Sequence, residues 1–275
     1  MIPPSIALLL YAMLTEQAVG DLFLAGLLPG ILGWVLYSLT VLLLYQFKPS
    51  LRPPPSHSSS AYEKMRALLT LLPLLLFFML MIYGIYFGWF TPTEGASIGA
   101  FILILVAIWQ KTTFGALKNA AVATLQLSNK LFLMLIGAQI MAYFVSVAQL
   151  STAIIDWISA HQLSNTAIIL SILLFYIVLG TCLDAIAMLM ISLPVVYPLI
   201  VALQIDPIWF GILSVLTVEL GLITPPIGMN IFVIKAINPK ISLTTLYHGI
   251  APFVLCDFIR LILLFLFPAT TTILI

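Results

Sequence analysis

The chain has 275 residues, of which 63% are hydrophobic and 7% are charged, and its formal net charge is +1. This composition is too apolar for a soluble domain and is typical of a membrane protein with several helical spans. The net charge of +1 is itself uninformative, and the sequence shows no basic face for nucleic acid. Cys182 and Cys256 lie in apolar segments, where we interpret them as small buried hydrophobic residues, not as a disulfide or metal pair.

Apolar segments separated by polar breaks organise the first part of the chain. Two adjacent prolines, Pro3 and Pro4, precede a half-length apolar helix at about residues 6–14. Longer apolar windows predict full membrane spans at about residues 22–47, 65–89, 95–110 and 130–150. The segment 48–64 between the first two spans is rich in proline and serine and predicts a polar linker. Residues 111–129 are more polar with a helical period, which predicts a separate helix at the membrane interface.

Two interruptions within apolar sequence mark the second part of the chain. After a polar loop, apolar helices flank a break at residues 180–184, which predicts a re-entrant hairpin with its tip at that break. A further apolar helix begins at Pro207 and is interrupted at Pro225 and Pro226. Proline removes a backbone donor and clashes with the preceding turn. Such a break is tolerated at membrane depth only where the freed backbone is buried in protein or lines a cavity. A final span is expected at about residues 250–267.

The positive charges orient these spans across the membrane. With the polar linker placed in the cytoplasm, every Lys and Arg except Arg260 falls on the cytoplasmic side. The segments expected outside contain no Lys or Arg. Arg260 follows Asp257 by three residues in the last span, and this helical spacing predicts an ion pair between the two side chains.

The two Pro-Pro sites belong to a repeat. Each is followed by an apolar half-helix, a polar turn, a Gly-x-x-Pro at 26–29 or 249–252, and a long apolar span. Because the first half-helix ends outside and the second inside, the pair predicts an inverted repeat, as in many secondary transporters. Only the second unit has a hairpin in front of its prolines. We therefore expect the C-terminal portion of a longer protein, with roughly 130–160 further residues upstream.

The polar residues at the two breaks are the candidate functional residues. Asp184 lies at the hairpin tip, where an ionisable group costs about 2.5–3.5 kcal/mol to insert and is usually functional. Carbonyl and hydroxyl oxygens with one carboxylate suit a small hard cation such as Na⁺, and no His/Cys set favours a transition metal. An alternative and compatible interpretation is that Asp184 caps the following helix while Gly180 caps the preceding one.

The second break is expected to place unwound carbonyls and a half-helix end opposite the hairpin. The alternative interpretation of the second break is a purely structural kink. Glu219 is expected either to bind ions or protons or to be a satisfied carboxyl, and Asn230 either to line the same cavity or to bond a neighbouring helix. No Ser/His/Asp set, phosphate-binding glycine loop or nucleotide motif is present, so the sequence predicts neither an enzyme nor an ATP-driven pump.

Several of these motifs resemble those of one transporter family. The similar segments are 2–6, 26–30, 90–95, 180–188, 206–211 and 219–230, together with Pro194 and Pro198, and the resemblance extends over nearly the whole chain. They are similar to the large membrane subunit of tripartite ATP-independent periplasmic (TRAP) transporters, the DctM-like family. The resemblance implies an all-α, multi-pass protein of the bacterial inner membrane with inverted repeats, a re-entrant hairpin and broken helices, in which a transport domain moves as an elevator against a scaffold.

The resemblance also implies a division of the chain. Residues 1–21 and 165–240 are expected in the transport domain, residues 22–164 in scaffold and arm helices that include the cytoplasmic linker, and residues 241–275 in the last scaffold span. Sodium coordination is expected at Gly180, Thr181, Asp184, Gly221, Thr224 and Gly228. The substrate cavity is expected at Pro3, Pro4, Ser5, Glu219, Pro225, Pro226 and Asn230.

The implied function is a permease subunit of a sodium-coupled importer of organic acids such as C4-dicarboxylates. Its implied partners are a small TRAP membrane subunit, a periplasmic substrate-binding protein and the lipid bilayer, with Na⁺ as coupling ion and no cofactor. Because the family's first hairpin lies before Met1, the chain is expected to be incomplete as it stands. The alternatives are a secondary carboxylate transporter without a binding protein and a non-transporting fragment.

Overall fold

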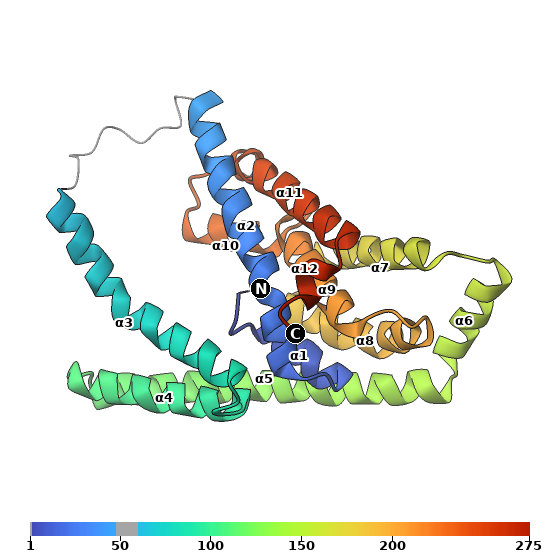
Figure 1. The fold of residues 1–275 in the computed structure, drawn as a ribbon, viewed down its shortest axis with the longest axis horizontal. Helices are drawn as coiled ribbons and strands as arrows, with labels where there is room; N and C mark the ends of the chain where they lie inside the picture. Colours follow the sequence, from blue (N-terminus) through green and yellow to red (C-terminus); the bar gives the residue numbers. More distant parts are fainter. Residues whose placement is uncertain (1, 48–59) are drawn as a thin grey trace. The chain divides into compact units, whose positions relative to one another are not determined.

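The computed structural model describes residues 2–47 and 60–275, and these residues form helices and no strands (Figure 1). Among them, six helices are long enough and apolar enough to cross a membrane. These are α2 (Val19–Phe47), α3 (Ala61–Tyr86), α4 (Pro92–Trp109), α5 (Phe114–Val147), α8 (Ala185–Ala202) and α11 (Leu243–Leu266). The predicted class, an all-α polytopic membrane protein, is confirmed. Most of the predicted linker, residues 48–59, lies outside the described residues.

The helices belong to two compact units. The larger contains the described residues of 1–37 and 121–275, and the smaller those of 38–120. In the smaller unit, α3 packs on α4, and both helices begin with a capping box. In the second box the Thr91 N–H donates to Glu94 Oε2 at 2.8 Å, and the Glu94 N–H donates to Thr91 Oγ1 at 3.3 Å. These bonds satisfy N–H groups that a helix start leaves without a partner.

Helix α9 (Pro207–Ile223) forms the centre of the larger unit. Its sequence is largely apolar and most of its residues are buried, as expected for a helix enclosed by others. The helices that pack on it are α1 (Ile6–Thr15), α7 (Asn165–Gly180), α8, α10 (Met229–Ile237), α11 and α12 (Ala269–Thr272). The fully buried Tyr11 of α1 donates its hydroxyl to the Pro207 carbonyl at 2.7 Å, which fixes α1 against the start of α9.

Helices α2 and α11 meet at a buried ion pair. Arg260 Nη1 lies 3.5 Å from Asp257 Oδ1, and the Tyr37 hydroxyl of α2 donates to Asp257 Oδ2 at 2.5 Å. The Arg260 guanidinium occupies the space that a side chain at Gly33 would need. The pair predicted from helical spacing is therefore confirmed, and α2 completes it.

Two sequence predictions about the middle of the chain are wrong. The interfacial helix at 111–129 and the span at 130–150 are one continuous helix, α5, of 34 residues. The polar loop that follows contains an 11-residue helix, α6 (Leu150–Ala160). The physical reason is that a change in polarity does not end a helix. Helices end at caps and prolines, and α5 contains no proline.

Candidate functional site

Helices α7 and α8 pack on each other as a helical hairpin whose tip is the turn between them. That the hairpin is re-entrant stays a prediction. Helix α7 ends at Gly180 with Thr181 as its C-cap, so Gly180 is the last helical residue and not the cap. The Thr181 hydroxyl donates to the Val178 carbonyl at 2.8 Å. Asp184 is exposed and caps α8, because its Oδ2 accepts the Ile186 N–H at 3.2 Å. The capping interpretation of Asp184 is confirmed, and its role toward an ion stays a prediction.

Cys182 lies in the same turn and is exposed. The prediction of a small buried hydrophobic residue is wrong for this cysteine. It belongs to the turn that links two helices and not to a packed helix face, so no neighbouring element covers it.

The second Pro-Pro site breaks a helix as predicted. Helix α9 ends at Ile223, α10 begins at Met229, and the Pro225–Pro226 bond is cis, as is Pro3–Pro4. The Thr224 hydroxyl donates to the Leu220 carbonyl at 2.6 Å. Gly228 precedes α10 with φ of +61°, a left-handed conformation that favours glycine.

The hairpin tip and the broken helix touch each other. A Cβ placed on Gly221 would lie 2.7 Å from the Gly180 Cα, so the two backbones approach as closely as glycine allows. The Gly228 N–H donates to the Thr181 carbonyl at 3.3 Å. Four of the six residues predicted to coordinate sodium thus meet at one place. Three of them are glycines, and the sequence did not indicate that Gly180 and Gly221 pack against each other.

This meeting point gathers groups that suit a cation. The C-terminal ends of α7 and α9 both reach it, and each carries the negative end of a helix dipole. The hydroxyls of Thr181 and Thr224 donate to backbone carbonyls, so their oxygens keep lone pairs for another partner. Oxygens of this kind are the ligands of hard cations.

Comparison with known proteins places the chain in a family. Residues 1–270 match the family model of the tripartite ATP-independent periplasmic transporter, DctM component. The chain belongs to this family. Membership and the six apolar helices place it in the bacterial inner membrane, as predicted.

Individual members of the DctM family resemble the chain over almost its full length. The C4-dicarboxylate TRAP transporter large permease protein DctM of Pseudomonas aeruginosa is 29% identical over 98% of the chain and 63% of its own length. The sialic acid TRAP transporter large permease protein SiaM of Vibrio cholerae is 28% identical over 100% of the chain and 64% of its own length. The ectoine TRAP transporter large permease protein TeaC of Halomonas elongata is 28% identical over 98% of the chain and 62% of its own length.

Two facts follow from these relatives. The chain spans less than two thirds of the length of each of them. They are named as transporter permeases and not as enzymes, which agrees with the prediction that the chain is not an enzyme.

The remaining predicted residues of this DctM-family chain lie in several environments. Ser5 caps α1 by accepting the Leu8 N–H at 3.4 Å, next to a buried Pro3 and an exposed Pro4. Asn230 is exposed in the first turn of α10, beside the exposed Pro225 and Pro226. Their assignment to a substrate cavity stays a prediction.

Glu219 lies on α9 between Val218 and Gly221, the two residues that approach Gly180 at the hairpin tip. Its carboxyl acts electrostatically on Asp257 and on Tyr37, which places it toward α11 and α2. Its assignment to the substrate cavity also stays a prediction.

Sequence reasoning missed Tyr247, which contacts the break directly. Its hydroxyl lies 2.8 Å from the Pro226 carbonyl and 2.9 Å from the Ile227 carbonyl, to which it donates. These carbonyls are exposed by the proline break, and a hydroxyl from α11 satisfies them. The contact joins residues about 20 positions apart, and no local pattern in the sequence signals it.

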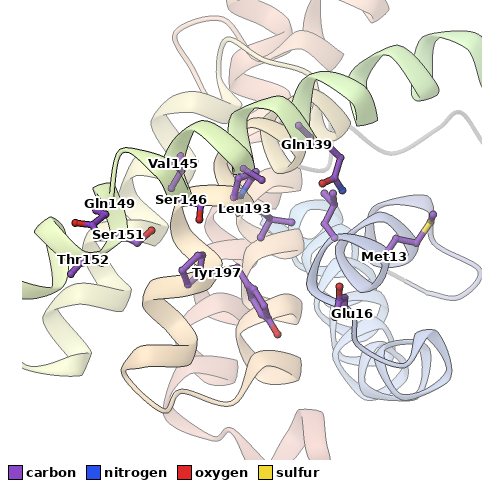
Figure 2. Close-up of a pocket in the computed structure, with 15 residues that line it drawn as sticks. Met13, Glu16, Gln139, Val145, Ser146, Gln149, Ser151, Thr152, Leu193 and Tyr197 are labelled. Carbon is purple, nitrogen blue, oxygen red and sulfur yellow. The ribbon is translucent and has the colours of Figure 1, made fainter.

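A polar cavity lies away from the predicted residues. It has a volume of about 420 Å³ and is formed by α1, α5, α6 and α8 (Figure 2). Its polar lining residues are Glu16, Gln139, Ser146, Gln149, Ser151, Thr152 and Tyr197. None of the predicted ion or substrate residues lines it. The sequence carries a signal for this cavity, because Gln139, Ser146 and Gln149 are spaced at the helical period and so fall on one face of a helix.

Proposed function

We propose that the chain is part of a TRAP large permease that imports organic acids, such as C4-dicarboxylates, in symport with Na⁺. The observation that carries the proposal is the meeting of the hairpin tip with the broken helix at Gly180, Gly221, Thr181 and Gly228. A hairpin tip packed against a broken helix brings backbone oxygens and helix ends to membrane depth, where transporters bind ions and substrates.

We assign the cation to the side of the site where the C-terminal ends of α7 and α9 meet. The ligands are the backbone oxygens near Gly180, Gly221 and Gly228, with the hydroxyls of Thr181 and Thr224. Asp184 supplies the negative charge that offsets the charge of one Na⁺. Its capping bond to Ile186 uses Oδ2 and leaves the second oxygen for a cation.

The carboxylate of the substrate is assigned to the start of α10. Asp184 already caps α8, whereas no side chain among the described residues caps α10. The first N–H groups of α10 and the positive end of its dipole therefore suit an anion. Asn230 lies in this first turn and offers an amide donor to the same ligand.

We also propose the predicted division into a moving and a fixed part, in line with the resemblance to the family. Helices α1, α7, α8, α9 and α10 correspond to the transport domain of residues 1–21 and 165–240. Helices α2 to α6 and α11 correspond to the scaffold and arm. In an elevator motion the bonds of Tyr247 to the break are among those that change. A small membrane subunit and a periplasmic binding protein complete the importer, in line with the tripartite family.

A transport assay tests the proposal. The whole permease that contains this chain is reconstituted with its small subunit and binding protein, and uptake of radiolabelled succinate is measured with and without a Na⁺ gradient. Asp184→Asn is expected to lower the apparent Na⁺ affinity about tenfold, equal to about 1.4 kcal/mol, with unchanged expression. Asparagine keeps the helix cap, so only the charge is lost.

Asp206→Asn is the matched control, because Asp206 is an exposed cap of α9 outside the candidate site. It is expected to leave the Na⁺ dependence unchanged. Uptake without the binding protein would favour a secondary carboxylate transporter. Absence of uptake by the complete assembly under any gradient would favour a non-transporting protein, and equal effects of the two variants would remove Asp184 from the ion site.

A further inference from the structure

An apolar cavity of about 550 Å³ lies between α2, α9, α10 and α11. Its walls are mainly the side chains of Ile223, Ile231, Ile234, Leu246, Ile250 and Phe253. The volume falls in the range of pockets that hold small ligands. Apolar cavities hold water poorly because water needs polar partners, so the natural occupant of this cavity is apolar.

The two hydroxyl groups in the lining are already engaged. The Tyr37 hydroxyl donates to Asp257, and the Thr245 hydroxyl lies 2.7 Å from the Ser242 hydroxyl. A carboxylate or sugar in the cavity would lose its hydration without gaining partners, which is costly. The cavity is therefore unsuited to an organic acid and is distinct from the proposed substrate site.

The turn between α10 and α11 is positively charged, and the cavity-lining residues Ile234 and Leu246 lie in the last turn of α10 and the first turn of α11 beside it. Lys235 Nζ donates to the carbonyls of Pro239 and Ile241, both at 2.6 Å, and this holds its charge at the turn. Lys240 is exposed in the same turn, and His248 is exposed at the start of α11. From Leu220 to Cys256 the sequence contains no Asp or Glu. This end of the cavity thus suits an anionic group.

We propose that the cavity binds an acyl chain of an anionic phospholipid, with the headgroup at the turn between α10 and α11. The walls include α2 and α11, two helices that cross the membrane, so the surrounding medium supplies acyl chains directly. Ile234 and Leu246 line the cavity close to the turn, so a chain inside and a phosphate beside Lys240 are compatible in one molecule. A bound chain packs on α10 and α11 together and so fastens the half-helix to the last span.

Native mass spectrometry of the whole purified permease tests this proposal without any transport assay. After delipidation in detergent, the permease is titrated with phosphatidylglycerol and with phosphatidylcholine of the same acyl composition. One phosphatidylglycerol is expected to be retained, with a preference over phosphatidylcholine of about fivefold from the lysine charges. Equal retention of the two lipids would overturn the assignment of an anionic headgroup.

Gly249→Phe fills the cavity. Gly249 lines it, and a Cβ placed there meets no heavy atom within 4 Å. Retention of phosphatidylglycerol is expected to fall about tenfold. Gly115→Phe is the matched control, because Gly115 also has open space around it and lies outside the cavity. Unchanged retention in Gly249→Phe, or a protein segment bound there in place of lipid, would overturn the proposal.

Lys240→Gln is the second variant, for use if Gly249→Phe does not fold. Lys240 is an exposed turn residue, so its replacement is expected to leave the fold intact. Retention of phosphatidylglycerol is expected to fall about threefold while that of phosphatidylcholine stays the same. An unchanged ratio of the two lipids in Lys240→Gln would also overturn the proposal.

Discussion

The two Pro-Pro breaks share a local sequence pattern but differ in their surroundings. Both contain a cis peptide bond and both precede a short helix. At the second break the hairpin tip approaches the backbone at Gly221, Gly228 bonds to Thr181, and Tyr247 bonds to the carbonyls. At the first break Ser5 caps α1, and Ile2 packs at Gly30 of α2.

A Pro-Pro motif within apolar sequence suggests both an interrupted helix and a binding site, and the comparison of the two breaks separates these properties. Adjacent prolines cannot continue a helix, because they remove donors and clash with the preceding turn. A candidate binding site arises only where a second element brings oxygens and helix ends to the interruption. Within the described residues, the second break has such an element and the first has a side-chain cap instead.

The largest expected effect comes from the glycine contact at the second break. In Gly221→Ala the new methyl group meets the Gly180 backbone at about 2.7 Å, and backbone cannot rotate away. Overpacking of this kind costs about 1–3 kcal/mol. The free energy of unfolding, measured by denaturant titration in mixed micelles, is expected to fall by that amount.

Gly30→Ala is the matched variant at the first break. It also lies inside a helix, but its new methyl group would be crowded only by the Ile2 side chain, which can move, since the nearest backbone atom, the Ile2 Cα, lies at 3.7 Å, an ordinary contact distance. The change in unfolding free energy is expected to stay within about 0.5 kcal/mol, because alanine itself favours the helix. A loss as large as that of Gly221→Ala would mean that the two breaks are packed alike.

Tyr247→Phe has a smaller effect and addresses the carbonyls at the second break. Loss of a hydroxyl that satisfies two backbone carbonyls is expected to cost about 0.5–1.5 kcal/mol. Hydrogen exchange at the first amides of α10 is expected to become about three- to tenfold faster, since the break is then held less firmly. Exchange at the first amides of α1 serves as the internal control.

Tyr143→Phe is the matched substitution, because Tyr143 is 74% exposed and lies outside the break. It is expected to leave both exchange rates unchanged. Equal acceleration at α1 and α10 in Tyr247→Phe would show a global loss of stability instead of a local one.

The features that sequence predicted correctly have local causes. Prolines, glycines and a charge within apolar sequence indicated the hairpin tip and the break, and each of these acts on its own backbone. The Asp257–Arg260 pair followed from spacing within one helix. In contrast, the predicted division of α5 into two helices is wrong, because a change in polarity along the sequence does not determine where a helix ends.

The features that sequence did not predict join distant segments. Tyr37 completes the Asp257 pair from 220 residues away, and Tyr247 reaches the break from a separate helix. Gly180 and Gly221 were predicted as ligands, but their close contact depends on how α7 packs on α9. Packing of this kind is decided by shape over many side chains, and single residue patterns do not encode it.

The smallest expected effect concerns the cap at the first break. In Ser5→Ala the N–H of Leu8 loses a bond that is long, at 3.4 Å, so the cost is expected near the low end for caps, about 0.5 kcal/mol. Hydrogen exchange at Leu8 is expected to accelerate about twofold, while exchange at Ile231 of α10, whose helix start has no side-chain cap, stays unchanged. If Ile231 responds as strongly as Leu8, the two breaks are coupled through α9, which packs on both α1 and α10. In that case the first break, which Ser5 caps, and the second break, which the hairpin tip contacts, would belong to a single cooperative unit.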